Sequence, residues 1–563
     1  MAVRRGDFTS FEMLLDAGAR FDPASADARM IRHAIRSSRI DVVDRILTLP
    51  GVDFSVMPVG PTLHMAAYKG EVEVLDRLLT ERARFKPLDN SERSVLTSAV
   101  SGRSFECVEL LLKHGADPNE GSSEGRSALE KAVSDSTPEI VRAFLRHGVD
   151  INHIDKNGLT LLMRAITRVW QNQNYVFWQR QLGTTVHVER AQQQVQDGKA
   201  IARLLVERGA DLEATSPRGT TALAMVARTD DVALLQMIVD RGADVTTTNV
   251  AGMSLIHHAM YARDLEVIRY IESLGFSALQ TSDTGLTPLH CAVDASFLEG
   301  IKYCTRRGAS LEAGTTEELK LDQVGKVPAG TRPLHIAARR YQRSIILELI
   351  AQGANLEGAA GDGQTRLIMA VRQGHVDPVR VFLESGADPD AADDLGRTPL
   401  MHAVLNRHNA AFDLLWAYVT DINQADRDGM TALHHAMSRG FTGQQRAIEL
   451  IGRGVSRSPV NAEGRTPLMC YQGKRITSDR TLIDLLIEGT DDINATDHEG
   501  WTTLMHMIEH GSPYAVQALV ERGADRSVIA NDGTTLSTLL EERMACRRCR
   551  PLSADIIALL RQP

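Results

Sequence analysis

The sequence predicts an all-α fold, a solenoid of stacked helix-turn-helix units, and three observations support this fold class. A phrase built around a glycine recurs along the chain. A second phrase, close to T-P-L-H, lies between successive copies of the first. The 563 residues are also too many for one compact hydrophobic core, so the chain must be several domains or a repeat array. The two recurring phrases favour the array.

The glycine phrase marks the end of the second helix of each repeat. It appears as KHGADPN, RHGVDIN, ERGADLE, DRGADVT and ESGADPD, with 33 residues between neighbours such as Gly115 and Gly148. Glycine suits this place because a helix commonly ends in the left-handed conformation. The steps from Gly148 to Gly209 and from Gly308 to Gly353 are 61 and 45 residues, which is 28 and 12 more than 33. These two steps predict insertions into the array.

The T-P-L-H phrase marks the start of the first helix of each repeat. It appears as GLTPLHCAV, GTRPLHIAA, GRTPLMHAV, GMTALHHAM and GRTPLMCYQ. The threonine is a predicted N-cap, and the proline takes the first helical position, where a missing N–H does no harm. Such pairs are Thr287–Pro288, Thr398–Pro399 and Thr466–Pro467. The histidines of the phrase occur once per repeat, as His64, His290 and His335, which predicts a recurring hydrogen bond near each cap and no metal cluster.

These residues resemble the ankyrin repeat family. The T-P-L-H phrase, a leucine pair in the second helix such as Leu111 and Leu112, the G-A-D ending and the period of 33 all match that family. The resemblance covers nearly the whole chain, as about fifteen repeats. It implies a curved stack of helical hairpins with β-hairpin fingers along one edge. It also implies that partners bind the concave helical face and the finger tips.

The predicted organisation follows from the repeats and their interruptions. The first repeat lacks most of its first helix, so the chain is either a fragment of a longer protein or has a non-standard cap. The predicted segments are an incomplete N-terminal ankyrin unit at 1–21, repeats at 22–169, a helical insertion at 170–198, repeats at 199–313, an extended finger insertion at 314–330, and repeats with a C-terminal cap at 331–563.

The insertion at 170–198 is the richest candidate for function. It begins with WQNQNYVFW, which holds Trp170, Tyr175, Phe177 and Trp178 in a chain with only 5% aromatic residues. A turn at LGTT and a second helical pattern predict a helical hairpin that projects beyond its neighbours. The aromatic residues either pack the two projecting helices together or leave at least one tryptophan exposed as an anchor for a partner.

Two other interruptions carry less information. ELKLDQ within 314–330 alternates enough to extend a finger into a hairpin, and a flexible spacer is the alternative. GKRITSDRT at 473–481 is polar and predicts a surface loop.

Acidic residues gather in the predicted fingers of the C-terminal half. The candidates are Asp390, Asp393, Asp394, Asp426, Asp428, Asp497 and Glu499. An edge of like charge would attract a basic partner and speed its encounter. The alternative is that turns favour aspartate for local hydrogen bonding.

Two short motifs could hold a metal ion. HMIEH, from His506 to His510, has the spacing of some metalloproteases, but it lies where a first helix belongs and no third ligand is evident. CRRC, at Cys546 and Cys549, has no second pair to complete four ligands. We expect neither to bind a metal, and no phosphate-binding or nucleophile motif is found. We expect no catalytic residue and no cofactor.

Bulk composition excludes several function classes. The chain is 43% hydrophobic and 24% charged, with a formal charge of −9. A nucleic-acid binder would usually carry a basic face, and no apolar run is long enough for a membrane span. Six scattered cysteines without a secretory leader favour reduced thiols in the cytoplasm or the nucleus.

We therefore expect a non-catalytic scaffold that binds one or more proteins, basic ones among them, and no nucleic acid or membrane. We expect the chain to be a monomer. One alternative is a substrate adaptor or a host-directed effector, although no docking box or secretion signal is evident. Another is the regulatory array of a larger enzyme or channel. A shared scaffold says little about role, because the family serves unrelated functions.

Overall fold

A computed structural model describes most of the chain. The described residues are 60–80, 95–118, 127–340, 342–359, 363–406, 408–438, 441–471, 480–510, 512–545 and 554–561, with a few single positions before residue 60. They form two compact units, Met1–Asp283 and Thr284–Pro563, and each unit is described by itself. The predicted incomplete unit at 1–21 lies almost entirely outside the described residues.

The N-terminal unit consists of short helices that come in pairs. Its helices are α4 (Gly60–Lys69), α5 (Val72–Thr80), α6 (Val95–Gly102), α7 (Phe105–Lys113), α8 (Ala128–Asp135), α9 (Pro138–Arg146), α10 (Leu161–Gln181), α11 (Val188–Glu207), α12 (Ala222–Val226), α13 (Val232–Asp240), α14 (Leu255–Ala259), the 3-10 helix η4 (Met260–Ala262) and α15 (Leu265–Ser273).

The C-terminal unit continues the same pattern and adds two strands. Its elements are α16 (Pro288–Asp294), α17 (Leu298–Arg306), β1 (Leu319–Leu321), β2 (Gly325–Val327), α18 (Pro333–Arg339), α19 (Arg343–Ala351), α20 (Arg366–Gln373), α21 (Val376–Glu384), α22 (Pro399–Asn406), α23 (Asn409–Trp416), α24 (Ala432–Met437), α25 (Phe441–Gly452), α26 (Arg480–Glu488), α27 (Thr503–His510), α28 (Pro513–Glu521), α29 (Leu536–Ala545) and α30 (Ala554–Leu560).

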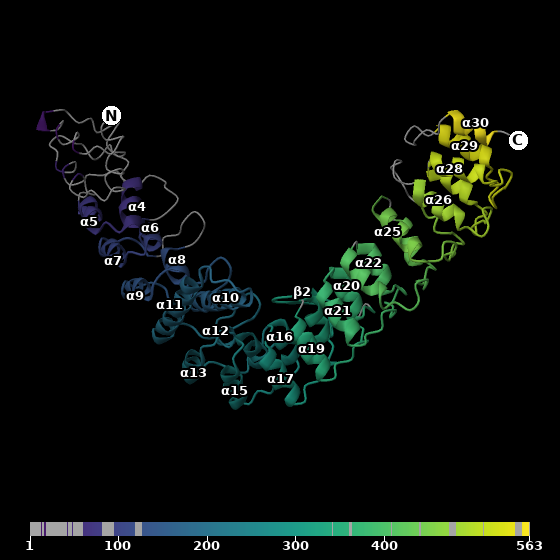
Figure 1. Ribbon diagram of the computed structural model, residues 1–563. Helices are drawn as coiled ribbons and strands as arrows, with labels where there is room; N and C mark the ends of the chain where they lie inside the picture. Colours follow the sequence, from purple (N-terminus) through teal and green to yellow (C-terminus); the bar gives the residue numbers. More distant parts are fainter. Residues whose placement is uncertain are drawn as a thin grey trace. The chain divides into compact units, whose positions relative to one another are not determined.

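Within each unit the helices form two layers (Figure 1). In the N-terminal unit the first helices α4, α6, α8, α10, α12 and α14 contact one another in sequence, and so do the second helices from α5 to α15. Small residues such as Ala66, Ala99 and Ala132 are fully buried between first helices, which lets the helices approach closely. The predicted all-α repeat fold is confirmed.

The caps explain why each first helix begins where it does. The Thr287 hydroxyl accepts from the His290 amide at 3.4 Å, and His290 Nδ1 lies 3.1 Å from the Thr287 nitrogen. His335 Nδ1 accepts from the Arg332 amide at 3.0 Å in the same way. The predicted hydrogen bond near the cap is thus confirmed for these two histidines. At Thr466 the hydroxyl accepts from Met469, but only one turn follows instead of a helix.

The fingers are simpler than the β-hairpins that were expected. Four of them are turns closed by single antiparallel bridges, at Ile154–Thr160, Thr215–Thr221, Thr496–Thr502 and Ile529–Thr535. The cause is their length, because about ten residues between helices leave room for a tight turn and little pairing.

The segment 314–330 forms a short antiparallel hairpin, with Leu319 opposite Val327. It folds back toward α16, because the buried Asp294 carboxylate accepts from the amides of Gln323 at 3.3 Å and Val324 at 3.1 Å. The hairpin is therefore attached to the first helix α16. The other predicted insertion, 473–481, lies almost wholly outside the described residues.

Candidate interaction surfaces of the array

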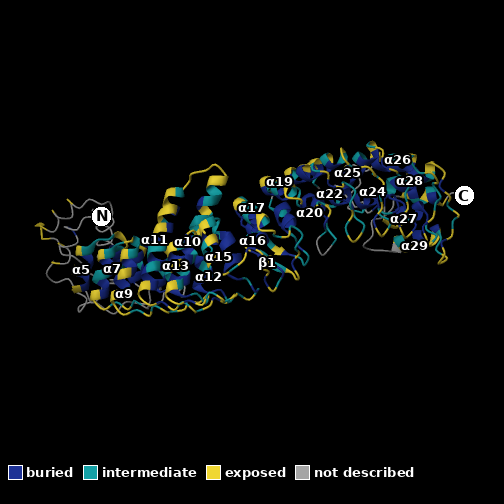
Figure 2. Cartoon of the chain, turned by 90° about the horizontal axis from the view of Figure 1, so that it is seen from below, coloured by how far each residue is buried: buried dark blue, intermediate teal, exposed yellow. Residues whose placement is uncertain are grey.

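The longest helix pair of the N-terminal unit, α10 and α11, projects beyond its neighbours (Figure 2). Each helix runs without a break from the repeat into the predicted insertion 170–198, so the projecting part is a continuation of the repeat's own helices. Thr160 caps α10 by accepting from the Met163 amide at 3.3 Å. His187, which precedes α11, is in the left-handed conformation with φ 57° and makes no side-chain cap.

Small apolar residues hold the two helices together. Val169, Val176, Ala191 and Val195 are all less than a tenth exposed. Gly198 of α11 lies against Val169, because a Cβ built on this glycine would be 2.7 Å from Val169 Cγ2. The private core of the hairpin is therefore aliphatic, with aromatic rings elsewhere.

Exchanging Gly198 for alanine tests this close approach. Glycine to alanine in a helix normally raises stability by about 1 kcal/mol. Here we expect the free energy of unfolding to fall by about 1–3 kcal/mol, because the new methyl group overlaps Val169. Hydrogen exchange measured by mass spectrometry, read at the exchanged helix, reports the change, because repeat arrays unfold locally. Gly452→Ala is the matched control, since nothing lies within 4 Å of its Cβ, and equal effects of the two exchanges would contradict the packing argument.

Arg168 fixes the hairpin to the preceding repeat. Its guanidinium donates to the carbonyl oxygens of Val133 at 3.1 Å and Ser136 at 2.8 Å, and it lies 3.4 Å from an Asp197 carboxylate oxygen. Burial lowers the pKa of Arg168, and the nearby charge of Asp197 opposes that shift. One side chain thus joins α8, α10 and α11.

Two of the predicted aromatic residues face the following repeats. The Arg228 guanidinium lies over the Trp170 ring, 4.6 Å from its centroid. The Arg263 guanidinium lies over the Phe177 ring at 3.9 Å. Both tryptophan and phenylalanine are half-buried. Neither packing between the two projecting helices nor an exposed anchor describes these two rings fully, because each stacks on an arginine of a later repeat.

The other two aromatic residues lie nearer the hairpin tip. The Tyr175 hydroxyl donates to the Val186 carbonyl oxygen at 2.9 Å, and the side chain is 37% exposed. Trp178 packs edge-on against Phe177, with ring centroids 5.0 Å apart, and is half-buried.

A cavity opens on each side of the hairpin, within the N-terminal unit. The first, of about 500 Å³, is lined among others by Trp170, Phe177, Arg228 and Arg263. The second, of about 930 Å³, is a groove between the hairpin and the first helices of the preceding repeats. Both volumes are within the range of ligand sites in proteins. Sequence reasoning located the hairpin but could not foresee either cavity, because their walls come from separate repeats.

The groove has tyrosine and arginine at its rim. It is lined by Tyr68, Arg103, Tyr175 and Arg190 among others, and all four side chains are exposed. Arg103 is in the left-handed conformation, with φ 58°, and donates to the Asp135 carbonyl oxygen at 2.9 Å. Tyrosine and arginine are the residue types that concentrate in protein interfaces.

Three of the predicted acidic finger residues point inward. The side chains of Asp393, Asp426 and Asp497 are 6%, 1% and 1% exposed. Each has one oxygen that accepts from two backbone amides of its own turn, as Asp497 does from Glu499 and Trp501. These carboxylates shape the turns and cannot present charge to a partner, as the turn interpretation had predicted.

The remaining acidic candidates differ in exposure. Asp394, Asp428 and Glu499 are exposed, and Asp390 is half-buried. The Asp390 carboxylate accepts from the amides of Thr420 at 2.9 Å and Asp421 at 3.2 Å, so it ties one finger to the next. The predicted acidic edge is therefore reduced to three exposed carboxylates.

The second oxygen of each inward aspartate meets a histidine that sequence reasoning missed. The pairs are Asp393–His402 at 2.9 Å, Asp426–His435 at 2.8 Å and Asp497–His506 at 2.8 Å. In every pair the two residues are nine positions apart, and this recurring spacing could have revealed them. The pair joins a finger turn to the first helix that follows it.

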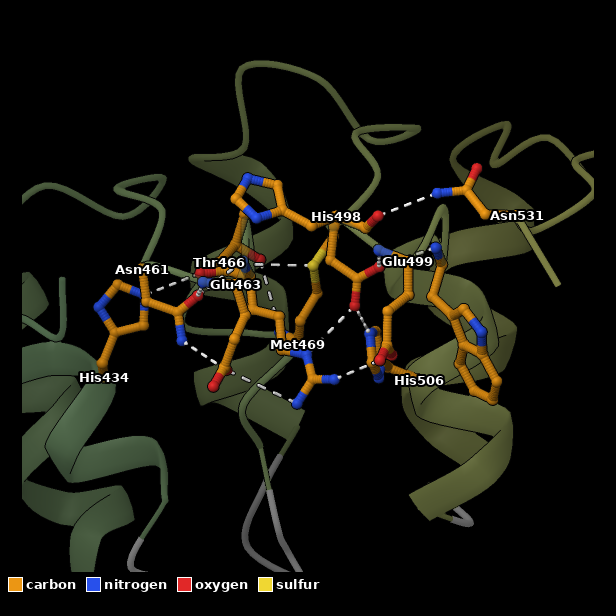
Figure 3. A network of polar contacts seen from close by, with 12 residues as sticks. His434, Asn461, Glu463, Thr466, Met469, His498, Glu499, His506 and Asn531 are labelled. Carbon is orange, nitrogen blue, oxygen red and sulfur yellow. Dashed lines mark hydrogen bonds and ion pairs between the residues drawn. The ribbon is translucent and has the colours of Figure 1, made fainter. Parts of the chain in front are cut away.

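The finger around Asp497 is also joined to the preceding repeat (Figure 3). Arg465 Nε donates to Asp497 at 3.1 Å, and its terminal nitrogen lies 3.3 Å from Glu499. Burial by itself would raise the pKa of Asp497, but hydrogen bonds from Trp501, His506 and Arg465 lower it below its usual range.

The two candidate metal motifs have different outcomes. HMIEH lies on α27, which contacts α29 as a first helix contacts the next. His506, Glu509 and His510 are close enough for one ion, but His506 Nε2 already bonds to Asp497. The arrangement agrees with the repeat-helix interpretation. Cys546 and Cys549 lie outside the described residues.

Comparison with known proteins places these features in context. A profile of the family described as ankyrin repeats (3 copies) matches residues 31–122, 63–155, 313–393, 334–426 and 388–455. Two similar proteins are the ankyrin repeat and SAM domain-containing protein 6 of Rattus norvegicus, 38% identical over 82 residues, and that of Mus musculus, 37% identical. In both cases the match covers 14% of this chain and 9% of the relative.

In the part of the chain that the structure describes, no helix combines the length and the apolar character that crossing a bilayer requires.

Proposed function

Because the chain belongs to the ankyrin repeat family, we propose that it is a non-catalytic scaffold that binds a protein partner. Ankyrin repeats are in general protein-interaction modules. The partner would lie across the face formed by the first helices of the N-terminal unit, with the finger tips as a further contact.

The observation that carries this proposal is the groove of about 930 Å³ beside α10 and α11. A regular repeat has a tight turn where these helices project, so the wall that the hairpin adds is a departure from the scaffold. Its rim residues Tyr68 and Tyr175 are 55% and 37% exposed. Large exposed aromatic rings beside arginines are typical of the residues that dominate binding energy.

The groove has polar walls that are already ordered. Arg164 forms an ion pair with Asp155 and lies 3.6 Å from the buried Glu130, and its NH1 donates to Ser134 at 3.2 Å. Such preorganisation lowers the entropy cost of binding, because fewer side chains have to be fixed by the partner.

Affinity purification with mass spectrometry tests the proposal on the full chain. The variant combines Tyr175→Ala with Arg190→Ala, which removes one ring and one cation from the rim of the groove. We expect recovery of the partner to fall about tenfold or more, as for loss of a binding hot spot.

Tyr418→Ala is the matched control, because Tyr418 is 38% exposed and lies in the other compact unit. Equal recovery by the groove variant and the control would overturn the assignment of this face. Circular dichroism of both variants shows whether a loss comes from unfolding.

A second candidate function rests on the relatives. Their names combine ankyrin repeats with a SAM domain, so arrays of this kind occur beside other domains in one protein. The array would then be the interaction arm of a larger protein. Immunoblotting of endogenous protein distinguishes the two, because a mass well above 61.7 kDa would favour the larger protein.

A further inference from the structure

The cavity on the other side of the hairpin has a wall rich in cationic side chains. It measures about 500 Å³ and is lined by α10, α11 and the turns of the next two repeats. Arg180, Arg228 and Arg263 line it, against two carboxylates, Asp230 and Asp264. In a chain with a formal charge of −9 this is a local reversal of charge.

Aromatic rings hold the guanidinium group of Arg228 in place. Arg228 lies over Trp170 and over Tyr261, 4.6 Å from each ring centroid. A guanidinium stacked on rings in this way forms hydrogen bonds through its N–H edge, because its faces are occupied. The stacking also fixes the orientation before any ligand arrives.

Arg263 is held at the expense of backbone strain. Its φ is 55°, in the left-handed region that costs a side-chain-bearing residue about 1 kcal/mol. The equivalent turn after α20 has Gly374 in this conformation, with φ 79°. The arginine lies over Phe177 at 3.9 Å and donates to Asn174 Oδ1 at 2.8 Å. The Arg263 side chain is therefore held by contacts with α10.

The carboxylates of the cavity are engaged by neighbouring residues. Asp230 accepts from Lys199 Nζ at 2.5 Å and from Gln173. Asp264 caps α15 by accepting from the Glu266 amide at 2.7 Å. Lys199 thus offsets the charge of Asp230, and the start of α15 interacts favourably with that of Asp264.

The same wall contains hydrogen-bond donors that lack acceptors. Trp170 Nε1 and Asn174 Nδ2 are buried and have no hydrogen-bond partner within the described chain. A buried donor without an acceptor costs about 1–3 kcal/mol. Because these two atoms are themselves buried, they lie behind the surface of the cavity, and the charge of the arginines is what favours a ligand with acceptor oxygens.

We propose that this cavity binds an acidic side chain, glutamate or aspartate, of an extended segment of a partner protein. The carboxylate would accept from the N–H edges of Arg228 and Arg263, and Arg180 would meet further acidic residues at the rim. The identity of the occupant as a protein rests on the proposed scaffold function. The carboxylate site itself stands on the geometry alone.

Fluorescence anisotropy with labelled octaglutamate tests the site on the full chain, with octaglutamine carrying the same neutral dye as the reference probe. We expect octaglutamate to bind and octaglutamine to bind about tenfold or more weakly, since charge-assisted hydrogen bonds are worth roughly 1.5–3 kcal/mol. Arg228→Gln and Arg263→Gln are each expected to weaken octaglutamate about tenfold.

Two further variants keep the test decisive. Arg208→Gln is the matched control, because Arg208 is exposed at the end of α11 and does not line the cavity. The affinity of this variant for octaglutamate should be unchanged. Arg180 is exposed at the rim, so Arg180→Gln leaves the stacked rings around Arg228 and Arg263 intact. Its affinity for octaglutamate therefore still tests the site if the Arg228 variant fails to fold. Equal affinities of the two peptides, or unchanged binding in the Arg180 and Arg228 variants, would overturn the proposal.

Competing ligands separate the sources of negative charge. Displacement of octaglutamate by millimolar inorganic phosphate, or equal binding of polyuridylate, would overturn the assignment to a carboxylate. Tyr175→Ala with Arg190→Ala lies in the other groove and should leave octaglutamate binding unchanged. If this variant loses the protein partner but still binds octaglutamate, the result bears on the proposed scaffold function and leaves the carboxylate site unaffected.

Discussion

Replacing Asp497 by alanine is expected to lower the stability of the C-terminal repeats by about 3–5 kcal/mol, the range for breaking a buried ion pair. The carboxylate is almost completely buried and bonds to His506 at 2.8 Å and Arg465 at 3.1 Å. Its removal leaves these two side chains and the amides of Glu499 and Trp501 without their acceptor.

Hydrogen exchange measured by mass spectrometry is the appropriate readout, because repeat arrays unfold locally and a single global value averages over many repeats. We expect faster exchange in α27 and in the turn before it. Glu499→Gln is the matched control, since it removes only an exposed ion pair with Arg465, worth at most about 1 kcal/mol. An Asp497 variant no less stable than the Glu499 variant would show that the inward carboxylate is not structural.

Acid is expected to destabilise α24 through His434. Burial lowers the pKa of His434 to about 4, although its Nε2 hydrogen bond to the Arg465 carbonyl oxygen at 3.0 Å opposes this shift. Above about pH 6.5 the histidine is neutral in both states. Between about pH 6.5 and pH 4, His434 is protonated in the unfolded chain but stays neutral in the folded chain. The free energy of unfolding therefore falls by about 1.4 kcal/mol for each pH unit by which the pH is lowered in this range.

The difference between the wild type and His434→Gln isolates this effect. At pH 7.5 the variant should be less stable, because it loses the hydrogen bonds to Thr431 and to the Arg465 carbonyl. At pH 4.5 the gap should shrink by about 2–3 kcal/mol, since glutamine takes up no proton. Hydrogen exchange of α24 at several pH values measures this. A gap independent of pH would contradict this role of His434.

The inward aspartates change the interpretation of the acidic fingers. An acidic surface for a basic partner and a set of aspartate-shaped turns would have the same amino-acid composition. Only the burial of each carboxylate distinguishes the two interpretations. The carboxylates of Asp426 and Asp497 are buried and accept hydrogen bonds from backbone amides and histidines. The residues that a basic partner could contact are therefore the exposed Asp394, Asp428 and Glu499. That partner remains a prediction.

Local signals in the sequence determined the secondary structure of this protein. Thr287 and Pro288 start a helix and Gly115 ends one because capping depends on residues within one turn. The period of these signals was enough to predict the repeat fold and to place the projecting hairpin. Even the Asp–His pairs are visible as a spacing of nine positions, once their meaning is known.

Only the tertiary structure decided which faces of these elements are available. Trp170 and Phe177 stack on Arg228 and Arg263, which belong to later repeats, so neither a private core nor a free anchor could be chosen from the sequence. Both cavities likewise have walls from several repeats. The physical reason is that capping and periodicity are local along the chain, whereas burial and ion pairing depend on distances between residues that the chain brings together only on folding.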